Sequence, residues 1–322
     1  MSAEPMRQRV ALQPVDAIEV TIVVDNFVDL LMAGTETVRR APPAWDTLER
    51  EALLAEHGLS LLVKAERAGR TATVLYDAGL GRSTALHNLD VLGTKVTDLR
   101  AIVLSHGHVD HHGGLEGMVR RLGRRGLPLL LHPDAWRDRK AVFPNGAEIH
   151  LPPPSRHDLE QEGVEITEER APSLLLDDTV LVTGQVERVT SFEKGFPLQH
   201  ARTPEGWEPD PWVWDDQAAV FLLRGKGLVV LSGCSHAGII NVVRHAQTVT
   251  GTKRIHAVVG GLHLTGGLFE PIIPDTIHEM AAIGPDVVVP CHCTGWRALQ
   301  ELARRMPDAY VHASVGTSLR FA

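Results

Sequence analysis

The stretch "LSHGHVDHHGG", residues 104–114, contains four histidines and one aspartate. An apolar, β-branched run comes immediately before it and predicts a buried strand. In an extended or turning segment, residues two apart project the same way, so His106 and His108 can bind one ion. Asp110 and His111 then turn back toward a second position. Imidazole and carboxylate groups are ligands of Zn²⁺, Fe and Mn, so the stretch predicts a metal site at a strand end.

The second half of the chain repeats a strand followed by a histidine. It does so in "GLVVLSGCSH" (227–236), "IHAVVGGLHL" (255–264) and "PDVVVPCHCTG" (285–295). Strands that alternate with helices predict an α/β architecture, in which sites collect beyond the strand ends. Gly113 and Gly114 would let the backbone fold tightly under such a site.

The chain length and apolar content allow one large domain over residues 1–322. A rigid proline break, "LPPP" at 151–154, predicts a division into two αβ halves, at about 18–150 and 170–322. The segment 191–217 is rich in Pro and Gly and holds three of the six tryptophans. A loop of this length is usually functional or disordered, and its aromatic residues favour a packed, lid-like insertion.

Composition argues against several classes of function. Lys and Arg total 32 against 40 Asp and Glu, so a net charge of −8 offers no general field for a phosphate backbone, and we expect no nucleic-acid partner. No run approaches the roughly 20 apolar residues that cross a bilayer, and residues 1–30 lack the apolar core of a signal peptide. The odd number of cysteines suits a reducing compartment. We therefore expect a cytoplasmic protein with a small-molecule substrate and no membrane partner, and leave open whether it is a homo-oligomer.

The pattern His-x-His-x-Asp-His followed by two glycines resembles the metallo-β-lactamase superfamily. Seven motifs in order resemble one subgroup, the 7,8-dihydropterin-6-methyl-4-(β-D-ribofuranosyl)-aminobenzene-5′-phosphate synthase-like proteins. They are "VDN" (24–26), "AEHGLSLLV" (55–63), "LYDAGLG" (75–81), "LSHGHVDHHGG" (104–114), "LSGCSHAGIIN" (231–241), "VVGGLHL" (258–264) and "CHCTG" (291–295). The resemblance implies an α/β fold, the αββα four-layer sandwich, with one or two metals at its edge.

The resemblance also implies a ligand set. His106, His108 and a third histidine would hold one metal, while Asp110, His111 and a late histidine, matched by His292, would hold the other. Strand alternation would send the neighbouring Cys291 and Cys293 to the face opposite His292, where packed, non-ligating thiols are expected.

Two departures from the family pattern affect that set. Cys234 stands where a bridging aspartate is usual, and either a metal-bound thiolate or a buried neutral thiol fits this position. The motif Pro-Gly-His-Thr is absent, and its nearest counterpart is "VTGQV" (182–186), which places Gln185 at the histidine position. We expect His236 to supply the third imidazole. His263 is the second candidate and would otherwise line the substrate pocket as a catalytic residue.

Other residues would support the site. Asp77 resembles the carboxylate that orients a metal-bound histidine, although a turn role is equally open. Asn26, Glu56 and His57 would lie at the pocket rim as substrate-binding residues, or serve as caps. The last two candidates for substrate binding are Trp207 and Trp212, which could stack on flat rings or anchor the lid.

These features give three functional hypotheses. The first is a hydrolase that uses a metal-bound hydroxide on a small ester, lactone or phosphoester, with Asp110 accepting the proton of water. The second is a transferase that joins a dihydropterin pyrophosphate to an aminobenzene ribosyl phosphate. The third is a metal-based redox or ligand-sensing protein. One or two divalent metals are expected, Zn first, with Fe and Mn as alternatives.

Overall fold

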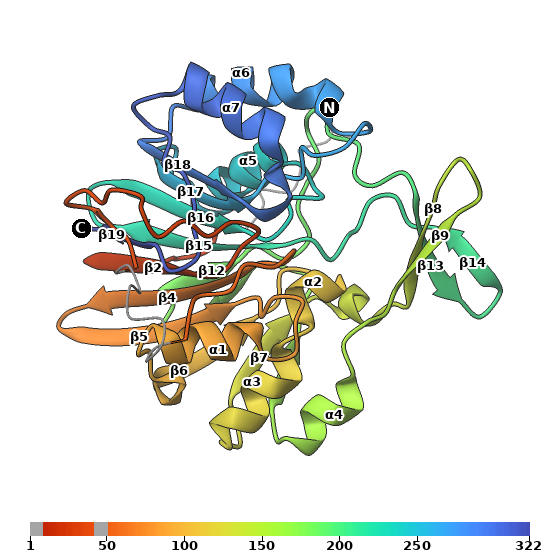
Figure 1. The fold of residues 1–322 in the computed structure, drawn as a ribbon, viewed down its shortest axis with the longest axis horizontal. Helices are drawn as coiled ribbons and strands as arrows, with labels where there is room; N and C mark the ends of the chain where they lie inside the picture. The colour runs from red at the N-terminus through yellow and green to blue at the C-terminus, as the bar shows by residue number, and fades with distance from the viewer. Residues whose placement is uncertain (1–8, 42–50) are drawn as a thin grey trace.

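The structure is a computed structural model that describes residues 9–41 and 51–322. Two large sheets pack face to face, and helices cover both outer faces (Figure 1). Residues 1–8 and 42–50, which the predicted domain includes, lie outside the described residues. No helix in the described part of the chain combines the length and apolar character needed to span a bilayer.

Within the described residues, the first sheet has eight strands in the order β10-β7-β6-β5-β4-β2-β19-β3. Their bounds are β2 Ala17–Val24, β3 Val38–Arg39, β4 Ser60–Arg67, β5 Arg70–Tyr76, β6 Leu99–Val103, β7 Pro128–Leu131, β10 Glu165–Glu168 and β19 Ser318–Phe321. Strands β5, β6, β7 and β10 run parallel, and the connections between them carry α1 (Thr84–Val91), η1 (Val96–Asp98), α2 (Val109–His112), α3 (Leu115–Leu122), η2 (Pro133–Trp136) and α4 (Arg156–Gln161). Parallel strands place the ends of β5 and β6 at one edge of the sheet.

The second sheet has seven strands, with β11-β12-β15-β16-β17-β18 in order and β1 beside β15. Their bounds are β1 Pro14–Val15, β11 Ser173–Leu175, β12 Val180–Val182, β15 Ala218–Leu223, β16 Gly227–Ser232, β17 Ile255–Gly261 and β18 Val287–Cys291. Its connections carry α5 (Ile239–Thr250), η3 (Glu270–Ile272), α6 (Ile273–Ile283) and η4 (His292–Thr294), and α7 (Trp296–Arg305) follows. Strands β16, β17 and β18 are parallel, so the three predicted strand-then-histidine segments end at one edge.

Three apolar clusters fill the interfaces between the four layers. The central cluster lies between the sheets and includes Val63 and Phe221. A second packs the outer face of the second sheet against its helices through residues such as Met280. The third, which includes Leu75 and Met118, packs the first sheet against α1 and α3. This layering confirms the predicted αββα sandwich.

The first and last strands of the chain each pair with the sheet built mainly by the other predicted half. Strand β1 pairs with β15 in the second sheet, whereas the last strand, β19, pairs with β2 in the first. In β19 the side chains of Leu319 and Phe321 are buried and Arg320 is exposed, which is the alternation of a half-buried strand. The C-terminal strand therefore completes the sheet that the N-terminal half builds.

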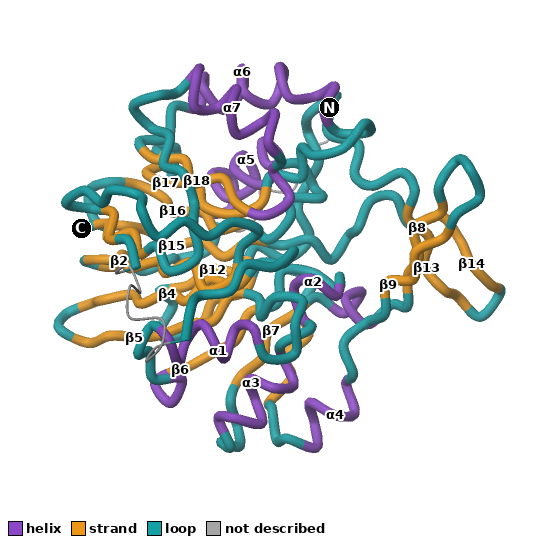
Figure 2. Tube along the Cα trace, in the orientation of Figure 1, coloured by secondary structure: helices purple, strands orange, loops and turns teal. Residues whose placement is uncertain are grey.

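A separate four-stranded sheet projects from one side of the sandwich (Figure 2). It consists of β8 (Arg139–Val142), β9 (Glu148–Leu151), β13 (Gln199–Thr203) and β14 (Gly206–Pro209). The segment 191–217 is thus not the long loop predicted from its composition. Its middle forms the β13–β14 hairpin, because β13 finds a strand partner in β8 that is remote in sequence.

Replacing Leu319 with alanine should lower the free energy of unfolding by about 2–5 kcal/mol, because it removes a fully buried side chain of β19 from the apolar cluster between the two large sheets. Urea unfolding followed by circular dichroism measures the change. Arg320→Ala on the same strand is the control, because its ion pair with Glu66 is exposed and should change stability by no more than about 1 kcal/mol. Equal effects of the two substitutions would contradict the placement of β19.

Candidate metal centre

The predicted ligands converge where strand ends of the two large sheets meet. The loop after β6 and the short helix α2 carry His106, His108, Asp110 and His111. The turn after β16 carries Cys234 and His236. His263 lies two residues after β17, and His292 follows β18 directly. Donor atoms approach one another within 4.8 Å in each of three overlapping groups, and two of these groups combine residues from both sheets. The centre therefore exists only when the sandwich is closed.

The first donor group consists of three buried imidazoles. His106 Nε2 lies 3.0 Å from His108 Nδ1, and His236 Nε2 lies 3.1 Å from the same nitrogen. His236 thus occupies the third position that the sequence analysis proposed for it. Gln185 is exposed, and its backbone N–H donates to the carbonyl of Arg170.

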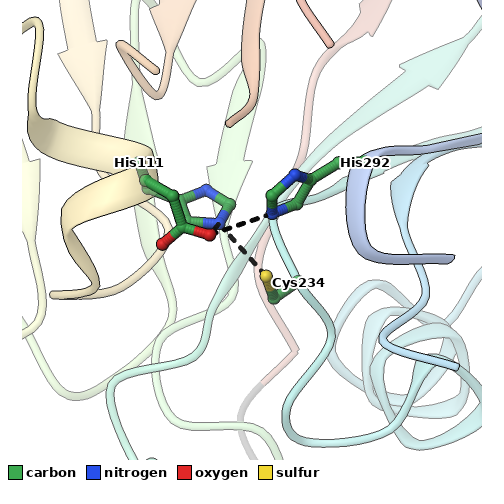
Figure 3. A group of neighbouring side chains, drawn as sticks. His111, Cys234 and His292 are labelled. Carbon is green, nitrogen blue, oxygen red and sulfur yellow. Dashed lines mark hydrogen bonds and ion pairs between the residues drawn. The ribbon is translucent and has the colours of Figure 1, made fainter. Parts of the chain in front are cut away.

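The second donor group is Asp110, His111, Cys234 and His292. Three of them, His111, Cys234 and His292, point toward one another in Figure 3. His111 Nε2 lies 3.1 Å from Cys234 Sγ, and His292 Nε2 lies 3.2 Å from Asp110 Oδ2. A third group joins Cys234 and His236 to His263, so His263 lies beside the junction of the other two.

Hydrogen bonds on the outer side fix which imidazole nitrogen faces inward. The Ser105 hydroxyl donates to Asp77 Oδ2, which leaves its oxygen to accept from His106 Nδ1 at 2.9 Å. His111 Nδ1 donates to Asp77 Oδ2 at 2.7 Å. In the same way, His292 Nδ1 donates to Asn26 Oδ1 at 3.1 Å. Each bond leaves Nε2 of its ring directed at the centre.

This arrangement fits a bound cation. His106 Nε2 and His108 Nδ1 face each other with unshared electron pairs, since the other nitrogen of each ring donates outward. The buried Nε2 of His292 has no hydrogen-bond partner among the described residues and faces the acceptor-only carboxylate of Asp110. Such contacts repel unless a positive charge lies between them, and nitrogen, carboxylate and thiolate donors suit Zn²⁺ or a similar divalent metal.

The protonation states agree with that fit. Burial, reinforced by neighbouring histidines, holds the pKa of both His106 and His236 well below its usual range. Burial also lowers the pKa of His108 to about 4. Burial alone would raise the pKa of Asp110, but His111 and His292 outweigh it and hold that pKa well below its usual range. Near neutral pH these groups present free lone pairs and one negative charge.

His111 and Cys234 must each lose a proton before they can bind a cation. Burial alone would lower the pKa of His111, but Asp110 and Asp77 outweigh it and raise it to about 9. Burial raises the pKa of the Cys234 thiol well above its usual range. Metal binding at this group is therefore coupled to proton release.

The backbone is strained around the centre. Asp77, His263 and His292 have positive φ angles of 61°, 44° and 51°, a region that residues other than glycine rarely occupy. Gly113 is required for a different reason, close approach, because a Cβ there would lie 1.9 Å from the carbonyl oxygen of Leu80. This is the tight packing that the glycine pair predicted.

The structure brings Asn26 and His57 to the rim of the centre. Asn26 Nδ2 donates to His57 Nδ1 at 3.0 Å, and His57 Nε2 lies 3.7 Å from Asp110 Oδ2. Glu56 has a turn role instead. Its carboxylate accepts from the backbone N–H groups of Leu80 and Gly81 and from the Thr84 hydroxyl.

The two tryptophans are not brought to the donor groups. Trp207 lies on β14 in the projecting sheet, where the Lys140 ammonium sits 4.9 Å from its ring centroid. Trp212 packs near Trp214, and the Arg188 guanidinium lies over both rings. Neither the composition of the segment 191–217 nor the positions of the two tryptophans in it indicated which groups their rings would contact. The geometry favours the packing alternative for both.

Sequence reasoning missed Gln199, which lies at the start of β13. Its Oε1 accepts from His108 Nε2 at 2.5 Å, and its amide donates to Asp210 Oδ2 at 3.2 Å. The buried guanidinium of Arg139 joins Asp210 to Asp215, and Asp215 accepts from the backbone N–H of Gly107 at 2.8 Å. The projecting sheet thereby fixes both the orientation of His108 and the loop that carries it.

The predicted position of Cys293 is corrected. Strand β18 ends at Cys291, and residues His292–Thr294 form the 3₁₀ turn η4, so strand alternation does not apply beyond Cys291. Cys291 is packed in the central core as expected. Cys293, however, lies beside the centre, and its thiol donates to Cys234 Sγ at 3.3 Å.

Comparisons with known proteins agree with this geometry. A family model described as "Metallo-beta-lactamase superfamily" matches residues 55–247. The chain is 27% identical to the 7,8-dihydropterin-6-methyl-4-(beta-D-ribofuranosyl)-aminobenzene-5'-phosphate synthase of Methanocaldococcus jannaschii, over 83% of this chain and 90% of that protein. It is 30% identical to an uncharacterised protein of the same organism, over 83% of this chain and 95% of that protein.

A solved structure shares the fold. It is described as a metal-dependent hydrolase of the beta-lactamase superfamily and matches with a TM-score of 0.70 and 22% identity, covering 95% of this chain and 98% of that one. A metallo-beta-lactamase fold protein from Bacillus subtilis matches with a TM-score of 0.52 and 13% identity, covering 95% of this chain and 100% of that one.

Replacing Gln199 with leucine should weaken metal binding by about 10–100-fold, because His108 loses the acceptor that orients it. Competition with a chromophoric chelator measures the affinity. Gln161→Leu, on the exposed face of α4, is the matched control and should bind metal as the wild type does. Unchanged affinity in the Gln199 variant would show that His108 is not oriented through this contact.

Proposed function

Because the chain belongs to the metallo-beta-lactamase superfamily, we propose that it is a metal-dependent hydrolase of a small ester, lactone or phosphoester. In this proposal each of the two main donor groups holds one divalent metal, zinc first. The observation that carries it is that two donor groups lie side by side, joined through Cys234 and His236, with the partly exposed carboxylate of Asp110 in the second group.

Divalent metals at this centre would lower the pKa of a coordinated water and stabilise negative charge that develops on the substrate. Hydrolysis adds the oxygen of water to the electrophilic carbon or phosphorus and breaks the bond to the departing oxygen. One proton of water passes to that departing oxygen. The protein residues must therefore take up, hold and deliver a proton.

Asp110 and His57 form the proton path in this proposal. The Asp110 side chain is 18% exposed, whereas the other members of its donor group are buried, so it is the carboxylate that substrate and water can reach. The hydrogen bond from Asn26 occupies Nδ1 of His57, so that Nε2 faces Asp110. The His57 side chain is 60% exposed. Because Nδ1 accepts from Asn26, neutral His57 carries its proton on Nε2; His57 can give this proton to the departing oxygen while Nε2 takes up the proton accepted at Asp110 Oδ2.

His263 would contact the substrate. It lies beside His236 and Cys234 and lines the adjoining cavity. Its buried Nδ1 has no hydrogen-bond partner within the described part of the chain. An imidazole nitrogen left open in this position can bond a polar atom of the reacting group.

A transferase is the second candidate, and the 27% identical relative named as a synthase favours it. The same donor groups would then bind a diphosphate leaving group while a carbon nucleophile attacks. Unlike the hydrolase, this enzyme would consume a second organic substrate and release diphosphate.

The test is hydrolysis of phenyl acetate, γ-butyrolactone and phenyl phosphate by protein reconstituted with Zn²⁺, Mn²⁺ or Fe²⁺. We expect turnover of at least one compound that is lost on dialysis against a chelator and restored by metal. His57→Gln should lower kcat by about a hundredfold with unchanged metal content, and Asp90→Asn, an exposed carboxylate on α1, should leave kcat unchanged. Turnover that survives metal removal, or no turnover of the three compounds by metal-loaded protein, would contradict the hydrolase.

A further inference from the structure

A cavity of about 240 Å³ adjoins the centre on the side of the second sheet. Three segments enclose it: the approach to β13, the turn between β16 and α5, and the stretch from the end of β17 to η3. The residues that line it are Phe192, Glu193, Lys194, Gly195, Pro197, Ser235, His236, Gly238, Leu262, His263, Leu264, Leu268, Phe269 and Ile272. Its inner end is formed by His236 and His263, so a molecule in the cavity reaches the donor groups directly.

Aromatic rings form the boundary between the cavity and the centre. Phe196 stacks on His236 with ring centroids 5.9 Å apart and an interplanar angle of 12°. Phe269 meets His263 edge-on, with centroids 4.3 Å apart. Phe196 and Phe269 also contact each other at 5.9 Å. Ring packing against Phe196 and Phe269 therefore holds the two imidazoles in place at the inner end of the cavity.

The charged residues at this cavity do not form an anion site. The buried Glu193 carboxylate accepts from the Thr190 hydroxyl and from the backbone N–H groups of Ile240 and Asn241 at the start of α5. These hydrogen bonds occupy the Glu193 carboxylate and stabilise the start of α5. Lys194 is exposed and is the single cationic side chain in the described lining. Phosphate and diphosphate groups are usually bound by several converging donors, often arginines, and the described lining contains no arginine.

We propose that this cavity binds the apolar acyl group of an unphosphorylated carboxylic ester or lactone, a short alkyl chain or a single ring. An apolar cavity of about 150 Å³ suffices for benzene, so 240 Å³ accommodates an acyl group of about six carbons. The inference rests on the proposed hydrolase, because the acyl carbonyl must lie at the donor groups while its chain extends past His263. It narrows the substrate to esters whose acyl side is hydrophobic.

Leu268 allows a test with little risk to folding. Its side chain is 49% exposed at the cavity wall, so Leu268→Trp fills the cavity from the solvent side without opening the core. Ile149→Trp is the matched control, because Ile149 is 53% exposed on β9 in the projecting sheet. The probes are hexanoate, acetate and phenyl phosphate, titrated calorimetrically into zinc-loaded protein, and methyl hexanoate and methyl acetate as substrates.

We expect hexanoate to bind at least about tenfold more tightly than acetate, and kcat/KM for methyl hexanoate to exceed that for methyl acetate by a similar factor. Leu268→Trp should remove both preferences, whereas Ile149→Trp should preserve both preferences and leave methyl acetate turnover unchanged. Equal binding of hexanoate and acetate, or tighter binding of phenyl phosphate than of hexanoate, would overturn the proposal.

The two readouts separate this inference from the proposed function. A hexanoate preference that Leu268→Trp abolishes, without turnover of either ester, supports the acyl cavity and counts against the hydrolase. Turnover of both esters with equal kcat/KM in wild type and variant supports the hydrolase and overturns the acyl cavity.

Discussion

The buried carboxylate of Asp77 is the constraint on which the centre depends. It accepts from the backbone N–H and hydroxyl of Ser105 and from His111 Nδ1, all at 2.7 Å. Through Ser105 it also sets the orientation of His106. A carboxylate so deeply buried is stable only with such partners, and once in place it decides which nitrogen each of two imidazoles turns toward the donor groups. Asp77 adopts a positive φ angle of 61°, and the three hydrogen bonds to its carboxylate help to hold this conformation.

All three sheets contribute residues to the centre. The first sheet contributes the histidine loop, the second contributes Cys234, His236 and His292, and the projecting sheet contributes Gln199. The buried Arg139, shared between Asp210 and Asp215, connects that projecting sheet to the loop. The two main donor groups are therefore complete only when the two large sheets are packed together. The apolar cavity adjoins the same centre, because the segments after β16 and β17, which carry His236 and His263, also line it.

Much of the fold and the donor set could be predicted, because strand ends, glycine pairs and histidine spacing are local signals. His292 was assigned through the family resemblance, and His236 was proposed because it follows a buried strand. Gln199 was not, since its contact with His108 joins residues 91 apart and a lone glutamine carries no local pattern. Cys293 was misplaced because β18 ends at Cys291, and the 3₁₀ turn η4 replaces the strand that the alternation assumed. The crossing of β19 into the first sheet depends on tertiary pairing, which periodicity alone does not specify.

The claim that two donor groups each hold one metal is tested most directly by elemental analysis of purified protein, with His236→Ala and Cys234→Ser beside the wild type. His236 belongs to the first group and Cys234 to the second. The structure leads us to expect two metals per chain in the wild type and a value falling toward one in either variant. A full metal complement in both variants, or one metal or none in the wild type, would contradict the two-metal centre.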